Sequence, residues 1–423
     1  MNVIAKTKEV FNAERSNVKR KLLKLVLAAP FWIILLSLFF IGFGVGRALY
    51  LTRTRQDQYV AEYWQSNSEI KFRHMSVYAG GIRAEGDKSP MTYTEGGRSI
   101  HLADIALIRS SLQAAANTGA GGVAKTISTD GKLRGWEDCY SSTVMATIDS
   151  LENIDGIDQV GGSAEAQLVA VGGNYKAFHP FRYLSGGFLS EVPVDTYQIV
   201  LNDVLAWKFF RSYDVVGNRI MINGQMFTII GVVEENSTRT AQLAGEQENR
   251  AFIYFGALGS ICNSASSDSA PAEGDAVVAE GGSNDYAIQC YEAMLPELVD
   301  GVGVTDFKNA LPSYSLNAPK LYVVNNTNRF SIIRVFDTVF PLGQTYSERT
   351  GYEFPYWEKA AQLTEDRLFY DYLMVALGSV LLLIGVIMTA LKLRARKSVS
   401  PDELFEADDD MTESEEKELA LKS

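Results

Sequence analysis

Three histidines, His74, His101 and His179, are the side chains of this chain best suited to bind a metal or transfer a proton near neutral pH. Their positions match neither the H-E-x-x-H spacing of zinc enzymes nor a paired-cysteine zinc motif. His179 precedes Pro180 in the aromatic stretch GNYKAFHPF, where we expect packing rather than ligation. No G-x-S-x-G motif indicates a serine nucleophile, although a pair of carboxylates brought together by the fold stays open. The sequence therefore predicts no catalytic, cofactor-binding or metal-binding residue, and no enzyme.

One glycine-rich stretch imitates a phosphate-binding loop. Residues 118–126, TGAGGVAKT, approach the G-x-x-x-x-G-K-[ST] pattern, but Ala124 stands at the second glycine. Glycine is needed there because the backbone N–H groups must curl round a phosphate. We interpret the stretch as a turn.

The three cysteines raise the question of a disulfide. Cys262 and Cys290 bracket a low-complexity, acidic segment at 263–285, which we expect to be a flexible insertion. Outside the cytoplasm, a bond between them would close the base of that insertion and add roughly 3 kcal/mol of stability. Two free buried thiols are the alternative, and Cys139 is unpaired in either case.

Two apolar runs decide where these residues lie in the cell. The runs Leu25–Gly46 and Tyr372–Leu391 contain no charged side chain, and about 20 helical residues cross a hydrocarbon core of about 30 Å. A cleaved signal peptide is the alternative for the first run, but its apolar region would be shorter, about 7–15 residues. We therefore predict transmembrane helices at 25–50 and 372–391.

Basic residues set the predicted orientation, because they stay on the cytoplasmic side of membrane helices. They precede the first run and follow the second: Lys6, Lys8, Arg15, Lys19, Arg20, Lys21, Lys24, Lys392, Arg394, Arg396 and Lys397. We expect a two-pass protein of the cell membrane, with both termini inside. Residues 1–24 form a basic cytoplasmic N-terminus, and residues 392–423 form an acidic, disordered cytoplasmic tail.

The remaining residues form the outer part of the protein. Polar, helical patterns at 51–70 and 347–371 predict two stalks that continue the membrane helices outward. Residues 71–346 then form one large outer domain. Within it, residues 143–154 (TVMATIDSLENI) have a helical pattern, and the Ala/Val alternation of residues 156–173 favours strands.

The clearest local signal is DVVGNRIMINGQMFTIIGVVEE at 214–235. Alternating apolar residues flank Asn223-Gly224, the pair that favours a type I′ turn in a two-residue hairpin. Before it, QIVLN predicts a strand and DVLAWKFF a helix capped by Asn202 or Asp203. This strand, helix and hairpin contain no obvious chemical group.

These residues resemble the extracytoplasmic core domain of MacB-type permeases, the FtsX-related mechanotransmission group of ABC transporters. The resemblance rests on about fifty residues and on a structural signature made by Asp214, Gly217, Ile220, Ile222, Asn223, Gly224, Phe227, Ile229, Gly231 and Val232. It implies an α+β extracytoplasmic domain, MacB periplasmic-core-like, on two stalk helices anchored by two transmembrane α-helices. None of the signature residues is catalytic in that family.

The resemblance also implies a mechanical role and a set of partners. A cytoplasmic ABC ATPase would hydrolyse ATP, and the stalks would carry its motion to an outer domain that drives or binds a substrate or partner. Such permeases usually have four membrane crossings, whereas this sequence shows two. We therefore expect a permease-like or accessory subunit that works with an ATPase and a second permease subunit, alone or in a homo- or hetero-oligomer.

Two other functions share the predicted topology. A polysaccharide co-polymerase that regulates chain length would carry a mostly helical outer domain, and a surface receptor or sensor would bind a ligand there. Strand-forming residues in the outer segment count against the first. The formal net charge of -12 argues against nucleic acid as a partner.

Overall fold

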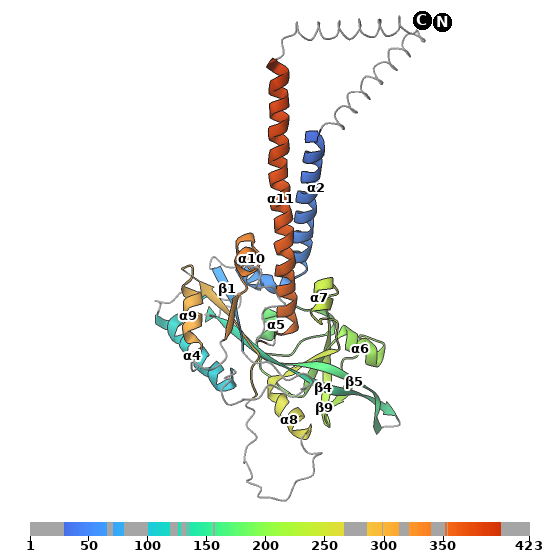
Figure 1. The fold of residues 1–423 in the computed structure, drawn as a ribbon. Helices are drawn as coiled ribbons and strands as arrows, with labels where there is room; N and C mark the ends of the chain where they lie inside the picture. Colours follow the sequence, from blue (N-terminus) through green and yellow to red (C-terminus); the bar gives the residue numbers. More distant parts are fainter. Residues whose placement is uncertain are drawn as a thin grey trace, which may run out of the picture. The chain divides into compact units, whose positions relative to one another are not determined.

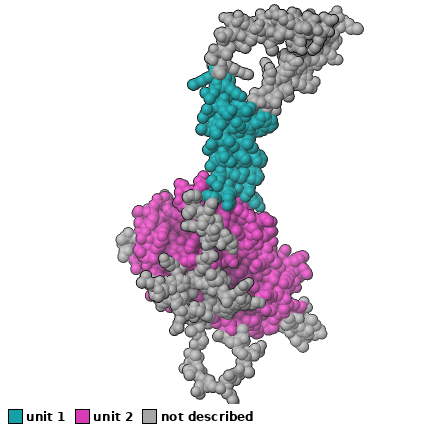
Figure 2. Space-filling view, viewed as in Figure 1, with its two compact units in different colours: residues 1–50, 369–423 teal, residues 51–368 magenta. Residues whose placement is uncertain are grey.

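The computed structural model describes residues 29–65, 71–79, 100–118, 126–127, 133–134, 136–154, 157–265, 286–297, 299–312, 321–339, 352 and 354–398. The chain divides into two compact units, residues 1–50 with 369–423 and residues 51–368 (Figure 2). The basic N-terminus predicted at 1–24 and the stretch around Ala124 lie outside the described residues. Most of the insertion predicted at 263–285 and of the tail predicted at 392–423 does so too.

The first unit contains two helices that are long and apolar enough to cross a membrane, α2 (Ala29–Arg53) and the greater part of α11 (Tyr356–Ser398). Glycines let these helices approach closely: a Cβ at Gly44 would lie 2.8 Å from a methyl group of Val375. Arg47 pairs with Asp371 at 3.2 Å in the same unit. Both predicted membrane segments therefore fall on helices.

The second unit is built on a ten-stranded mixed sheet with the order β12-β1-β11-β4-β5-β10-β7-β9-β6, in which β8 pairs with both β4 and β9. Strands β1, β4, β5 and β9 of this sheet are labelled in Figure 1. Most neighbours are antiparallel, and the pairs β5–β10 and β7–β9 are parallel. The strands are β1 (Lys71–Tyr78), β4 (Glu137–Ile154), β5 (Ile157–Gly173), β6 (Arg182–Gly186), β7 (Gln198–Asn202), β8 (Arg219–Ile222), β9 (Gln225–Glu234), β10 (Arg250–Tyr254), β11 (Cys290–Glu297) and β12 (Tyr322–Asn325). A separate pair joins β2 (Thr126–Ile127) to β3 (Leu133–Arg134).

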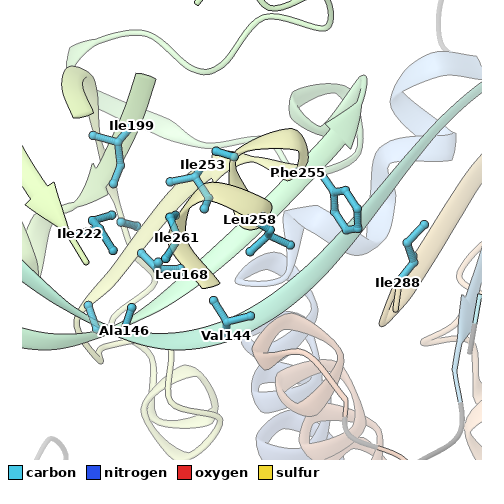
Figure 3. Packing of buried hydrophobic residues seen from close by; sticks show 14 of the residues in the cluster. Val144, Ala146, Leu168, Ile199, Ile222, Ile253, Phe255, Leu258, Ile261 and Ile288 are labelled. Carbon is cyan, nitrogen blue, oxygen red and sulfur yellow. The ribbon is translucent and has the colours of Figure 1, made fainter. Parts of the chain in front are cut away.

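Helices cover both faces of this sheet. One face, here the apolar face, packs against α4 (Leu102–Thr118), α6 (Asp203–Phe210), α8 (Leu258–Ala265) and α9 (Val302–Ala310). Figure 3 shows Leu258 and Ile261 of α8 beside Val144, Leu168 and Ile253 of the sheet.

The opposite face, here the docking face, packs against α3 (Val60–Gln65), α5 (Tyr175–Phe178) and the start of α11. Two further short helices are α7 (Arg239–Leu243) and α10 (Ile332–Val339), and 3-10 turns span Gln56–Tyr59 and Phe255–Ala257. Strand side chains alternate between the faces: Leu168 belongs to the apolar core and Val169 to the aromatic core of the docking face.

The predicted strand, helix and hairpin are present as β7, α6 and β8–β9. Asn202 caps α6, because its side-chain oxygen accepts from the N–H of Leu205 at 3.0 Å. Asn223 and Gly224 have φ of 47° and 81°, the two positive values that a type I′ turn requires. Ile220 lies opposite Phe227 across the hairpin, and both are fully buried.

Two predictions of local structure are wrong. Residues 143–154 form strand rather than helix, because they pair along their whole length with β5, with Ile148 opposite Ala164. The helix predicted at 51–70 ends at Arg53 and gives way to the turn Gln56–Tyr59 and the short α3. Side chains of this segment are buried in the second unit, among them Arg55 and Val60, so packing overrides the helical pattern.

Candidate functional site

The ten signature residues are Asp214, Gly217, Ile220, Ile222, Asn223, Gly224, Phe227, Ile229, Gly231 and Val232, and they build the turn and hairpin after α6. Their branched and aromatic members are fully buried on the apolar face. A Cβ at Gly231 would lie 2.0 Å from the carbonyl oxygen of Gly187, so only glycine fits where β9 meets the loop after β6. Asp214 and Asn223 are exposed.

Polar chemistry gathers instead on the docking face, beginning at the buried start of α11. Arg329 binds both carboxylate oxygens of Glu358, each at 2.7 Å, and also contacts Glu365 at 2.5 Å. Tyr78 of β1 donates to Glu358 at 2.9 Å. All of these side chains are buried, so the loss of one partner would leave the charge of the other buried and uncompensated. The arrangement fixes the first turns of α11 to the sheet.

A second set of buried ion pairs lies near Tyr356, the first residue of α11. Arg250 binds Glu235 at 2.7 Å, and its guanidinium lies 3.5 Å from the centre of the Tyr356 ring. Arg55 pairs with Glu246 and, at 2.9 Å, with Asp57. Burial raises the pKa of the Glu246 carboxyl to about 7, although the Arg55 charge opposes this shift.

The third polar feature is a histidine–carboxylate cluster on the same face. Glu292 of β11 is fully enclosed, and its Oε2 lies 2.6 Å from His179 Nε2 while its Oε1 lies 3.1 Å from His74 Nε2. Ser76 donates to Oε1 at 2.9 Å. Burial opposes ionisation of Glu292, but the nearby His179 and His74 hold its pKa well below the usual range. Cys139 Sγ completes the cluster, 3.8 Å from Oε2.

Sheet register assembles this cluster from distant parts of the chain. Glu292 lies directly opposite Ser76 on one neighbouring strand and opposite Cys139 on the other. His179 follows α5, where its ring stacks on Tyr175 with centroids 4.2 Å apart. The fold thus brings His74 and His179 to the carboxylate of Glu292. His101 instead directly precedes α4, which packs on the apolar face.

A pocket of about 660 Å³ opens beside the ion pairs, within the range typical of small-molecule sites. Its wall includes Arg55, His179 and Trp357. Arg55 Nε and Trp357 Nε1 are buried N–H donors without a hydrogen-bond acceptor in the described part of the chain. An oxygen atom of a bound molecule would satisfy either donor, so the wall is suited to a ligand with acceptor groups.

The cysteines are free thiols in this structure, so the predicted Cys262–Cys290 bond is not formed. The two residues belong to different layers. Cys290 lies in the core of the docking face, whereas Cys262 is on α8, which covers the apolar face. A disulfide needs Cα atoms within about 7 Å and converging side chains, and the intervening sheet prevents this.

Comparisons with known proteins agree with this architecture. Residues 97–281 match the family model of the MacB-like periplasmic core domain. The chain thus contains a MacB-like core domain of mixed α/β structure, the kind found in ABC transporter permease-type proteins, together with two candidate membrane helices. No curated protein sequence matches the chain significantly.

Three solved structures are similar to the chain at 13% sequence identity each. The periplasmic region of MacB from Actinobacillus actinomycetemcomitans has a TM-score of 0.33, with 60% of this chain and 89% of that one covered. The extracellular domain of the noncanonic ABC-type transporter YknZ from Gram-positive bacteria has a TM-score of 0.30, with 56% and 88% covered. A domain of a putative permease protein from Porphyromonas gingivalis has a TM-score of 0.28, with 60% and 88% covered.

Sequence reasoning missed the polar layer of the docking face. Its members come from separate segments, and no short motif joins Arg329 to Glu358 or Cys139 to Glu292. One available signal was a charged residue between apolar residues of a strand, as Glu292 is within CYEAMLPE. Such a residue faces the core only if partners neutralise it, which marks the strand for inspection.

Proposed function

We propose that the chain is a membrane-anchored, permease-like or accessory subunit of a MacB-type ABC transporter complex. Its outer domain transmits motion to a substrate or partner or binds one, and ATP hydrolysis is supplied by a cytoplasmic ABC ATPase that acts with a second permease subunit. The MacB-like core domain at 97–281 supports the class of protein. The absence of a catalytic motif from the sequence is consistent with an ATPase on another chain.

The single observation that carries the mechanical part of the proposal is the continuity of α11. This helix runs from Tyr356 to Ser398 without a break and contributes to both units. Its first turns are buried in the second unit, where Trp357, Ala360 and Ala361 pack and Glu358 pairs with Arg329. A helix gripped in this way would pass a displacement to the sheet rather than slide past it, because breaking a buried ion pair costs about 3–5 kcal/mol.

The proposed topology keeps the predicted division of the chain. Segments 25–50 and 372–391 cross the cell membrane, residues 71–346 lie outside, and both termini are cytoplasmic. Basic residues beside each span support this orientation. Val194 is 98% exposed in the outer domain and suits a test. In intact cells, a Val194→Cys variant should react with a membrane-impermeant thiol reagent, and labelling only after lysis would contradict the topology.

The partnership is tested by purifying the tagged full chain from its native membranes. We expect an ABC ATPase and a second permease subunit in amounts comparable to the chain, and a preparation free of any ATP-binding subunit would contradict the proposal. The reconstituted complex should then show an ATP-dependent change in protease sensitivity of the outer domain.

Coupling through α11 is tested on that complex. Insertion of two glycines after Phe369, at the boundary between the units, should abolish the ATP-dependent change while preserving assembly. The same insertion after the exposed Val194 is the control and should leave the change intact. An unaltered response in the Phe369 variant would show that α11 does not carry the motion.

Ligand sensing by the outer domain is a second candidate, favoured by the pocket beside Arg55 and Trp357. The two donors in its wall that find no acceptor among the described residues suit a ligand with oxygen acceptors. A receptor would bind such a ligand without a bound ATPase, which separates the two functions. The ten-stranded sheet of the outer domain counts against the mostly helical architecture expected of a polysaccharide co-polymerase.

A further inference from the structure

The cluster around Glu292 has the composition of a transition-metal site. Cys139, His179 and Glu292 each offer one ligand atom, and these atoms lie within 4.8 Å of one another. Sulfur, imidazole nitrogen and carboxylate oxygen are the three donors that zinc takes in proteins. All three residues are buried, unlike the exposed acidic groups that gather on many protein surfaces.

The two oxygens of Glu292 have different surroundings. Oε1 is occupied by hydrogen bonds from Ser76 at 2.9 Å and with His74 at 3.1 Å. Asn326 in turn donates to Ser76 Oγ at 2.7 Å, which directs the serine hydroxyl toward the carboxylate. Oε2 faces His179 and Cys139. Metal-binding carboxylates are usually held by such an outer shell of hydrogen bonds while one oxygen is presented to the ion.

Positioning of the three donors is rigid and open on one side. Cys139 and Glu292 are cross-strand partners, so the register of β4 and β11 fixes their separation. The His179 ring packs against both Tyr175 and Trp357, with ring centroids at 4.2 Å and 4.7 Å. His179 also lines the 660 Å³ pocket, which provides an entry path for an ion.

Charge balance favours a divalent cation. A divalent ion binds the thiolate form of Cys139. One divalent cation with a thiolate, a carboxylate and neutral imidazole is electrically neutral, as a buried site requires.

We propose that Cys139, His179 and Glu292 form a buried zinc site, with His74 and Ser76 as outer-shell groups. Binding replaces the 2.6 Å hydrogen bond between His179 Nε2 and Glu292 Oε2 by two bonds to one ion, so the proton of that hydrogen bond and the Cys139 thiol proton both leave the ligand atoms. Three protein ligands leave a fourth position on the ion. The proposal is independent of the transport function, because it concerns only residues of the outer domain.

The test uses the full chain in detergent, stripped with a chelator and titrated with Co²⁺ and then Zn²⁺. Cobalt bound to a thiolate gives an intense near-ultraviolet absorption band, so wild type should show this band at one Co²⁺ per chain and lose it to Zn²⁺. Cys139→Ser should lack the band, and Zn²⁺ should raise the Tm of wild type but not of this variant. Ser76→Ala should weaken Zn²⁺ binding about 10–100-fold.

Matched controls are Cys262→Ser and His101→Gln, a cysteine and a histidine outside the cluster, and both should bind as wild type does. A folded wild-type chain without the cobalt–thiolate band would overturn the proposal. Persistence of the band in Cys139→Ser would overturn it too. The wild-type measurement decides the matter even if a variant fails to fold.

Discussion

The two faces of the ten-stranded sheet are built on different physical principles. The apolar face is held by aliphatic and aromatic packing, and its hairpin residues Ile220 and Phe227 are fully buried without any ionic partner. The docking face buries charges: Arg329, Arg250 and Glu292 each lie almost without solvent. Hydrophobic packing tolerates small shifts, whereas a buried ion pair is satisfied in one geometry only. The docking face therefore determines how the first turns of α11 pack on the sheet.

This contrast is sharpest at Arg329. Arg329→Met leaves Glu358 and Glu365 buried without their cation, and we expect a loss of about 3–5 kcal/mol in the free energy of unfolding. Urea unfolding of the full chain in detergent, followed by tryptophan fluorescence, measures the change. Arg182→Met is the control: Arg182 pairs with Glu234 at 2.7 Å but is 77% exposed, so the loss should stay below about 1 kcal/mol. Equal losses in both variants would remove the distinction between buried and surface pairs.

The hairpin of the apolar face is tested by Gly224→Val. Gly224 has φ of 81°, a conformation that costs a side chain about 1–2 kcal/mol, and the loss of stability should be of that size. Gly187→Val serves as the control because a Cβ there meets open space and its φ is not in the left-handed region. A melting temperature of Gly224→Val equal to that of wild type would mean that the turn differs from the one described.

The docking face should also differ from the apolar face in the pH dependence of its stability. The pKa of Glu246 is raised in the folded chain to about 7 from an ordinary value of 4.5. A carboxyl with a raised pKa holds its proton more tightly when folded, so its contribution is favourable below about 4.5 and is lost as pH rises through 7. Glu246→Gln should flatten the pH dependence of unfolding between pH 4.5 and 7. An identical slope in wild type and variant would contradict the assignment.

The smallest expected effect concerns the thiols. Alkylation of the native chain should modify Cys262, which is half-buried, faster than Cys139 and Cys290, which are fully buried. After denaturation without reductant, mass spectrometry should find all three thiols alkylated. If Cys262 and Cys290 were protected from alkylation under those conditions, the disulfide predicted from the sequence would be present in the protein.

The sequence correctly predicted those parts of the structure that depend on residues close together in the chain. The β7, α6 and β8–β9 unit followed from a cap at Asn202, alternating apolar residues and the Asn223-Gly224 pair, all within forty residues. The same reasoning located the two membrane-length helices, because length and apolar content are properties of one segment. The wrong helix at 143–154 arose because its strand pairing with β5 is a tertiary contact that outweighs local propensity.

The docking face escaped prediction for a physical reason. Arg329 meets Glu358 only after β12, the following turn and α11 are in place, and Ser76 meets Glu292 only through register between strands more than two hundred residues apart. Nothing in the spacing of these residues encodes the contact. The candidate zinc site illustrates the same limit, since its histidine is ordinary in sequence and becomes a ligand candidate only beside Cys139.

One strand joins the two halves of this contrast. β4 begins beside the Glu292 cluster with Cys139 and then runs along the signature hairpin, where Ile148 lies opposite Ile222 of β8. About nine residues of extended backbone, roughly 30 Å, separate these points. Because an extended backbone stretches very little, a displacement of Cys139 on binding or release of an ion would also displace the β4 residues that pair with β8. β4 thus connects the candidate zinc site to the Asn223-Gly224 turn region.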